Sequence, residues 1–434
     1  MGVALSGREP RHRRGAAHLG DVAQAAEAVA RASYGKLIAF LAARTGDVAG
    51  AEDALSEAFA SALVDWPARG IPRTPEAWLL TVARRKMIDA ARRRRTGDEA
   101  AALLELMAAA LEPEPGGEAP IPDDRLRLMF ACAHPAIDAD VRAPLVLQTI
   151  LGFDAATIAS AFLVSPATMS QRLVRAKRRI KQAGVPFSVP AAADLRERLD
   201  AVLEAIYAAF AEGWSDPAGT EARRRNLAEE GIWLGRLVAS LLPAEPEALG
   251  LLALMLHAEA RRDARRDAHG EFVPLDEQDP ARWNAALIGE AEALLRRASA
   301  AGPSGRYQLE AAVQSAHAAR RLSGRTDWAA IENLYDALFA VTGSPVVAIN
   351  RAIAVAETRG AAEGLALLDA LELDAALAAR LAEYQPYWAA RAALLARTGS
   401  AAAARDAYQR AIGLESDPAV RRFLQQRSAQ LGKP

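Results

Sequence analysis

The sequence has one cysteine, Cys132, among 434 residues. A lone cysteine excludes a disulfide framework and a cysteine-based zinc site, and it is typical of a protein in a reducing cytoplasm. Apolar runs are also short. The best, residues 249–256, falls far below the about 20 residues that a membrane-spanning helix needs. The arginines near the amino terminus precede no apolar segment, which argues against a secretory signal. We therefore expect a cytoplasmic protein without membrane contact.

Aromatic residues are scarce, at 6% of the sequence, while alanine and arginine are frequent. Both are strong helix formers, so the composition predicts an all-α protein. The length allows roughly two to four domains. The net charge is only −1, from 53 Lys+Arg and 54 Asp+Glu, so the informative feature is where charges gather along the chain.

Residues 154–182 have the pattern of two helices joined by a tight turn. Ser165-Pro166 predicts a helix start, with serine as N-cap and proline at the first helical position. The stripe expected to be buried in this second helix is Met169, Leu173, Ala176 and Ile180. Polar side chains near its start and five basic residues after them are left exposed, as in a helix-turn-helix that places its second helix in a DNA major groove. The alternative is a solvated basic helix within a helical bundle.

A second basic segment follows Thr74-Pro75, another N-cap and proline start. Its predicted core stripe includes Leu79, Ala83 and Met87. From residue 84 to residue 95 there are seven basic residues and one acid, beside the aromatic Trp78. A cationic ridge next to a stacking ring suits a single-stranded nucleic acid. Taken alone, however, the ridge is better explained as a solvated face.

The remaining amino-terminal pattern consists of helices and one tether. Residues 21–44 read as a helix broken near Gly35, and residues 50–66 as a helix with one acidic face, stopped by Pro67 and Pro72. Residues 97–122 are acidic and rich in proline and glycine, which predicts a flexible linker. Further helices are expected from Asp123 to Cys132 and over residues 138–151, the latter ending at Gly152.

At this point the residues resemble a known family. Residues from about 33 to 182 are similar to extracytoplasmic-function sigma factors of bacterial RNA polymerase. The resemblance rests on three motifs in order: Gly50-Ala51-Glu52-Asp53-Ala54-Leu55 with Phe59; Pro75-x-x-Trp78-Leu79 continuing to Arg92-Arg93; and Gly152-Phe153 with Ile158-Ala159, followed by Ser165 to Ala176. It implies sigma region 2 at residues 21–96 and region 4 at 123–184, after a flexible arm at 1–20. One departure is Thr157, where many members carry glutamate.

The resemblance implies three binding surfaces and no catalytic residue, metal or cofactor. Contact with core RNA polymerase, through its clamp and flap, is expected at Glu52, Asp53, Ser56 and Glu57. Melting and reading of the −10 promoter element is expected at Trp78, Arg84, Arg85, Lys86, Asp89, Arg92 and Arg93. Reading of the −35 element is expected at Ser165, Thr168, Ser170, Gln171, Arg172, Arg175, Arg178 and Arg179.

The rest of the chain also looks helical and resembles a subgroup of these sigma factors with a long carboxy-terminal extension. We expect a family-specific helical domain at residues 185–300 and tetratricopeptide-like repeats at 301–434. Members usually carry asparagine where this chain has Ala211. An internal repeat is also visible without the resemblance, because two segments align at an offset of 40 residues. The first segment has Arg351-Ala352, Thr358, Gly364, Leu368 and Leu371, and the second has Arg391-Ala392, Thr398, Ala404, Tyr408 and Ala411 at the same positions. Such repeats would bind a protein partner or another part of the same chain.

Three hypotheses from different classes follow. The first is a sigma factor that directs promoter-specific initiation and is regulated by its extension. The second is a helix-turn-helix regulator that binds duplex DNA alone, with repeats that sense a ligand or peptide. The third is an enzyme in the extension. The polar run from Glu259 to His269 could form a phosphate or acid–base site, but solvated or interhelical ion pairs explain it better. His257 and Cys132 read as packed structural residues, and His317 lacks partners at metal spacing.

Overall fold

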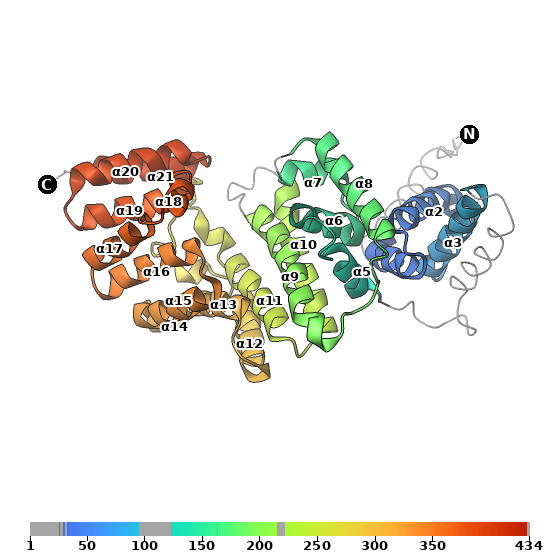
Figure 1. Ribbon diagram of the computed structural model, residues 1–434, viewed down its shortest axis with the longest axis horizontal. Coiled ribbons are helices and arrows are strands. Elements are labelled where there is room, and N and C mark those ends of the chain that lie inside the picture. The colour runs from blue at the N-terminus through green and yellow to red at the C-terminus, as the bar shows by residue number, and fades with distance from the viewer. Residues whose placement is uncertain are drawn as a thin grey trace, which may run out of the picture. The chain divides into compact units, whose positions relative to one another are not determined.

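The computed structural model describes residues 26, 29–30, 33–94, 123–162, 164–214 and 222–431. Within these ranges the chain forms helices joined by turns, with one isolated antiparallel bridge between Arg266 and Phe272 (Figure 1). The all-α prediction is confirmed. None of the described helices is long and apolar enough to cross a bilayer. The predicted arm at residues 1–20 and the predicted linker at 97–122 lie outside the described residues.

The chain divides into two compact units. The first comprises residues 1–213 and 226–230, and the second comprises residues 214–225 and 231–434. The basic segments predicted at 75–95 and 154–182 therefore belong to one unit. The helices in or entering the first unit, besides one over residues 33–45, are α2 (Val48–Arg69), α3 (Pro75–Arg94), α5 (Arg125–Cys132), α6 (Ala139–Leu151), α7 (Ala155–Ala161), α8 (Pro166–Gln182), α9 (Ala192–Trp214) and part of α10 (Ala222–Leu241).

The predicted break at Gly35 is wrong, because the helix over residues 33–45 runs through that position. The glycine serves a different purpose. A Cβ built at Gly35 would lie 2.2 Å from the carbonyl oxygen of Ile150, at the end of α6. Only glycine allows the two backbones to approach this closely. This contact joins the amino-terminal helices to the helix-turn-helix segment.

Helix α2 is longer than predicted. Asp47 caps its start by accepting a hydrogen bond from the Gly50 amide at 3.0 Å. Pro67 lies inside the last turn and does not stop the helix, which ends at Arg69. The face of α2 opposite its acidic residues is buried at Ala51, Leu55, Ala58, Ala62 and Trp66.

The helix-turn-helix segment folds as the sequence predicts. Gly152 ends α6 in the left-handed conformation, at φ 74°. Asp154 accepts a hydrogen bond from the Thr157 amide at 2.7 Å and so starts α7. Ser165 caps α8 through the Thr168 amide, with Pro166 at the first helical position. The predicted stripe of Met169, Leu173, Ala176 and Ile180 is the buried set of α8.

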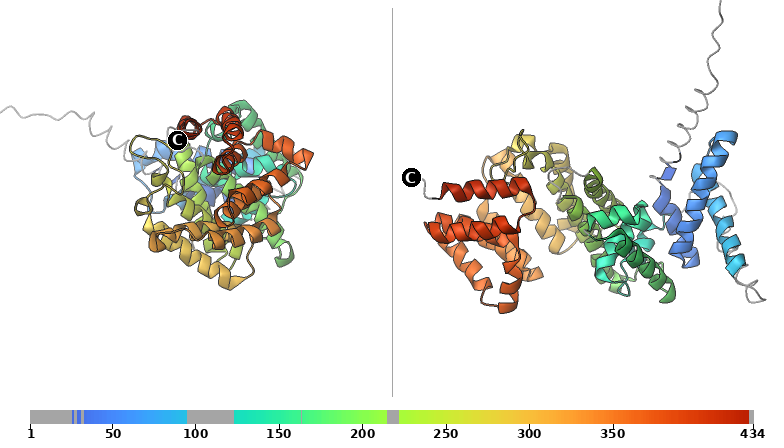
Figure 2. Two further views of the ribbon diagram at one scale, coloured as in Figure 1. Left: turned by 90° about the vertical axis from the view of Figure 1, so that its left-hand side faces the viewer. Right: turned by 90° about the horizontal axis from the view of Figure 1, so that it is seen from above.

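The second unit continues as antiparallel helices (Figures 1 and 2). Its elements after α10 are α11 (Pro246–Glu259), η1 (Arg262–Arg265), η2 (Pro280–Arg282), α12 (Ala285–Ala301), α13 (Arg306–Ala318), α14 (Arg320–Ser323), α15 (Trp328–Thr342), α16 (Pro345–Thr358), α17 (Ala361–Leu371), α18 (Ala375–Ala382), α19 (Gln385–Arg397), α20 (Ala401–Leu414) and α21 (Pro418–Gln430). Asp279 accepts a hydrogen bond from the Ala281 amide and so caps the start of η2.

The residues at the 40-residue offset occupy matching places in two helical hairpins, α16/α17 and α19/α20, which pack on each other. Arg351 of α16 pairs with Asp336 of α15, and Arg391 of α19 pairs with Asp369 of α17, across the intervening short helix α18. Thr358 and Thr398 each return a side-chain hydrogen bond to a carbonyl three residues earlier. The internal repeat read from the sequence is therefore a repeat of contacts as well as of residues.

Candidate nucleic-acid interface

The exposed side of α8 presents polar groups near its start. Thr168, Ser170 and Gln171 are exposed, and the Ser165 hydroxyl contacts Thr168 Oγ1 at 2.7 Å in addition to its capping bond. A capped helix with a buried apolar stripe and short polar side chains at its first turns can place those side chains against base edges. The two arginines in this part of α8, Arg172 and Arg175, each contact another side chain. Arg172 Nη1 lies 3.0 Å from Asp140, and Arg175 donates to Gln171 at 3.4 Å.

A cavity of about 430 Å³ lies between α8 and the turn before α6. One wall is formed by Ile137, Asp138 and Val141. The lining also includes the four arginines predicted for the −35 surface, which are Arg172, Arg175, Arg178 and Arg179. Such a groove, with cations on one wall, can hold phosphate oxygens and so fix the register of a helix on a duplex. The structure thus brings these four predicted residues together.

The second predicted surface, on α3, is only partly an open ridge. Arg85 and Arg92 are exposed, with Arg92 lying 3.9 Å from Asp89. Lys86 pairs with Glu57 of α2 at 3.0 Å. Trp78 is half-buried, and its ring makes an edge-on contact with Trp66, with centroids 5.7 Å apart. The side chain of Arg93 is not among the described ones.

Arg84 differs from its neighbours. Its guanidinium lies over the Phe40 ring, 5.1 Å from the centroid, and its buried Nε has no hydrogen-bond partner among the residues that the structure describes. Burial lowers the pKa of Arg84, and the charge of Arg44 adds to the lowering. Arg84 therefore packs against the helix over residues 33–45, whereas Arg85 and Arg92 point to solvent.

The acidic face of α2 meets the basic helix α8. Lys177 of α8 pairs with Glu52 in a contact where the side chains are only 9% and 13% exposed. Lys181 pairs with Asp47, at the start of α2. Burial raises the pKa of Glu52 in spite of the lysine, which lowers it. Of the predicted core-polymerase residues, Asp53, Ser56 and Glu57 remain exposed, while Glu52 is covered.

The sequence interpretation placed Lys177 and Lys181 on a basic face and gave them no partner. The only signal for this contact was complementary charge, since α8 carries no acid and the exposed face of α2 carries several. Which acid meets which lysine depends on packing across more than 100 residues. Sequence pattern alone does not supply that information.

The other candidates in the sequence are structural. Cys132 is fully buried, with its sulfur 3.5 Å from Thr149 Oγ1, and burial raises its pKa to about 12. His257 is 1% exposed, and burial lowers its pKa to about 4, so it is a packed neutral residue as predicted. In the polar run, Arg262 pairs with Glu259 and Arg266 with Asp417, in agreement with the ion-pair interpretation.

Comparison with known proteins supports the sigma region 2 part of the assignment. Residues 29–96 match the family model for sigma-70 region 2. Residues 198–299 match a model described as a family of unknown function, DUF6596. An uncharacterised protein of Rhizobium meliloti (strain 1021) is 41% identical over 379 residues, which cover 86% of this chain and 88% of that protein. No solved structure matches the chain.

The region 2 match supports an RNA polymerase sigma factor, a class of protein that is not enzymatic and that interacts with core RNA polymerase and promoter DNA. The chain belongs to the same family as the Rhizobium meliloti protein.

Proposed function

We propose that the protein is an extracytoplasmic-function sigma factor that directs initiation at a restricted class of promoters. The observation that carries the proposal is the combination of sigma-70 region 2 at residues 29–96 with a capped, basic helix α8 in the same unit. In this assignment Asp53, Ser56 and Glu57 contact the polymerase clamp. The exposed cations of α3 and the ring of Trp78 receive the opened −10 strand.

The −35 element is assigned to α8. Its amino-terminal polar residues read base edges, and Arg172, Arg175, Arg178 and Arg179 bind phosphates along the groove they line. Region 2 and the helix-turn-helix would then lie on DNA at two separate promoter elements. That arrangement requires the Lys177–Glu52 and Lys181–Asp47 contacts to open.

Regulation is assigned to these same contacts and to the extension. While α8 lies on α2, Glu52 is unavailable to polymerase and Lys177 is unavailable to DNA. The extension adds to this, since Arg198 of α9 donates to the Phe130 carbonyl of α5 at 3.0 Å. The helical hairpins α16/α17 and α19/α20 are assigned as tetratricopeptide-like repeats that contact a protein partner or polymerase and so set the balance between closed and open forms.

The test is transcription in vitro with purified core RNA polymerase. We expect promoter-specific transcripts from the full chain, or from a chain ending at residue 230, which retains the first unit. Absence of a specific transcript from both proteins, with a reference sigma factor active in the same assay, rejects the proposal. Binding to duplex promoter DNA without polymerase, in that event, would favour the helix-turn-helix regulator.

A further inference from the structure

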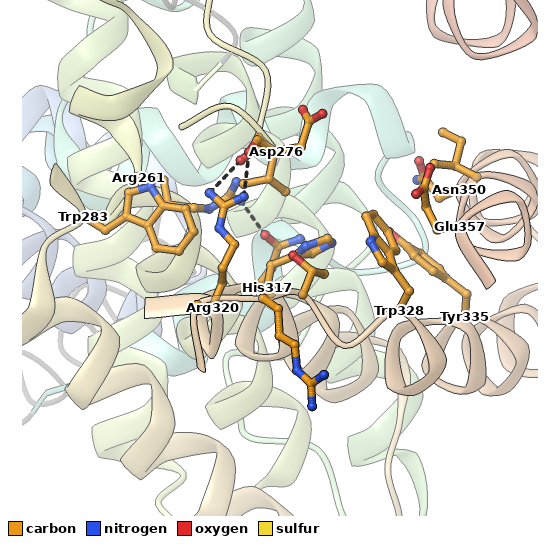
Figure 3. Close-up of a pocket in the computed structure, with 15 residues that line it drawn as sticks. Arg261, Asp276, Trp283, His317, Arg320, Trp328, Tyr335, Asn350 and Glu357 are labelled. Carbon is orange, nitrogen blue, oxygen red and sulfur yellow. Dashed lines mark hydrogen bonds between the residues drawn. The ribbon is translucent and has the colours of Figure 1, made fainter. Parts of the chain in front are cut away.

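A cavity of about 840 Å³ lies within the second unit, among α13, α15, α16 and the segments after α11 (Figure 3). Its volume falls in the range of about 300–1,000 Å³ that is typical of small-molecule sites. Arginines and aromatic rings line it together. The lining includes two arginines, Arg261 and Arg320, and the ring side chains of Trp283, His317, Trp328 and Tyr335. None of them belongs to the polymerase or promoter surfaces.

Arg261 is a desolvated cation in this wall. Its Nη2 donates to Gln314, which is a neutral acceptor. Burial lowers the pKa of Arg261 to about 10, and the charges of Arg265 and Arg320 contribute to the lowering. Among the described residues, no carboxylate forms an ion pair with it. A buried guanidinium without an anion is costly, so this position favours an anionic group from outside the chain.

The second arginine of the pocket is held in place by carbonyl groups. Arg320 donates to the carbonyls of Asp276 at 2.8 Å, Leu275 at 3.1 Å and Gln278 at 2.7 Å, and its guanidinium lies 5.1 Å from the Trp283 centroid. These partners fix the side chain but leave its charge uncancelled.

The two acids of the lining do not neutralise the arginines. Glu357 pairs with Arg397, and the Asp276 side chain is exposed. The contacts of the described residues therefore leave a net positive charge in the pocket, which favours an anionic ligand.

Aromatic rings from α13 and α15 also line the pocket. The His317 ring makes an edge contact with Trp328, with centroids 5.6 Å apart. Burial lowers the pKa of His317 to about 4 and raises that of Tyr335 to about 12, so both side chains are neutral at pH 7. Figure 3 shows the Trp328 and Tyr335 rings on the same side of the pocket, away from Trp283. A planar apolar group would find ring surfaces there.

We propose that this pocket binds a small organic anion with a planar, aromatic body. Its carboxylate or phosphate pairs with Arg261, and its ring lies against Trp328 and Tyr335. The extension thereby acquires a small-molecule site in addition to the helical surfaces through which it would contact macromolecules.

The first measurement is isothermal titration calorimetry on the full chain with benzoate, phenyl phosphate and uncharged benzamide. At least one of the two anions is expected to saturate with a Kd at or below about 1 mM. Benzamide, which has the same ring without the charge, is expected to bind at least about tenfold more weakly. The tighter anion tells whether the site is built for carboxylate or for phosphate.

Three variants then locate the site. Arg261→Gln should weaken the bound anion at least about tenfold, because a charge-assisted pair is lost. Trp328→Leu leaves Arg261 intact and should weaken the aromatic anions through loss of ring contact, which keeps the test informative if Arg261→Gln fails to fold. Arg321→Gln, an exposed neighbour outside the cavity, is the matched control and should bind as the unmodified chain does.

Three results overturn the proposal: neither anion binds, benzamide binds as tightly as the anions, or folded Arg261→Gln and Trp328→Leu both bind like the unmodified chain. None of these readouts involves polymerase or DNA. Failure here is therefore separate from failure of the sigma-factor assignment.

Discussion

Removing the Lys177 charge should release α8 from α2. The variant is Lys177→Met, which retains most of the side-chain length. It leaves the Glu52 carboxylate without its cation at a position where the side chain is 13% exposed and where, within the described parts of the chain, Oε1 already lacks a hydrogen-bond partner. In the open form the same carboxylate is solvated, so the substitution penalises only the closed form.

The size of the effect follows from burial. Removing one partner costs roughly 3–5 kcal/mol for a fully buried pair, and an exposed pair is worth about 0–1 kcal/mol. Because both side chains retain some exposure, we expect about 2 kcal/mol. At 1.4 kcal/mol per factor of ten, this shifts the ratio of open to closed forms about 30-fold toward the open form.

The assay is resonance energy transfer between dyes on α2 and α8. Cys132 is fully buried, so cysteines introduced at the exposed positions Val64 and Gln182 are the reactive thiols among the described residues. Lys177→Met should lower the transfer efficiency and raise the affinity for core polymerase. Arg178→Met, an exposed cation one position along α8, is the matched control and should leave the transfer efficiency unchanged. Unchanged transfer in folded Lys177→Met would refute the reasoning.

Three further predictions concern the same unit. Burial raises the pKa of Glu52 in the closed form, so protonation of Glu52 favours closure, and this contribution is lost as pH rises through the raised value. Energy transfer should therefore increase as pH falls from neutrality toward the ordinary glutamate range, and Glu52→Gln should remove the increase. Gly35→Ala would force a Cβ against the Ile150 carbonyl, so it should lower the unfolding free energy by about 1–3 kcal/mol in thermal or urea denaturation, and an unchanged midpoint contradicts the contact. Arg172→Ala should weaken use of −35 elements, whereas Trp78→Ala should impair transcription from duplex promoters far more than from pre-melted ones; equal loss by Trp78→Ala on both templates would count against a strand-capturing role.

Local signals in the sequence predicted the parts of the site that form within one helix. The Ser165 cap and the buried stripe of α8 depend on residues three or four positions apart, and both are confirmed. The same kind of reasoning was wrong at Gly35 and Pro67. At Gly35 the close approach of the Ile150 carbonyl outweighed the low helix propensity of glycine. At Pro67 the last turn of α2 accommodates a proline in spite of its low helix propensity.

Long-range contacts explain what the sequence did not predict. Glu52 was assigned to polymerase from its motif, yet its partner in this structure is a lysine 125 positions away. Arg261 was read as part of a solvated or ion-paired run. Its neighbours Arg262 and Arg266 do form ion pairs, but Arg261 itself turns into a pocket completed by α13 and α15. Residue type and spacing give the charge of such a side chain, and packing alone decides what it faces.

The matching ion pairs at Arg351 and Arg391 have a consequence for how this chain can change in length. Each arginine pairs with an aspartate on an earlier helix outside its own hairpin, Arg351 with Asp336 of α15 and Arg391 with Asp369 of α17. If one 40-residue segment of this array were duplicated or deleted, each arginine would still follow an earlier helix with an aspartate that it can pair with. The array can therefore lengthen or shorten by whole repeats without a change in the helices of the first unit.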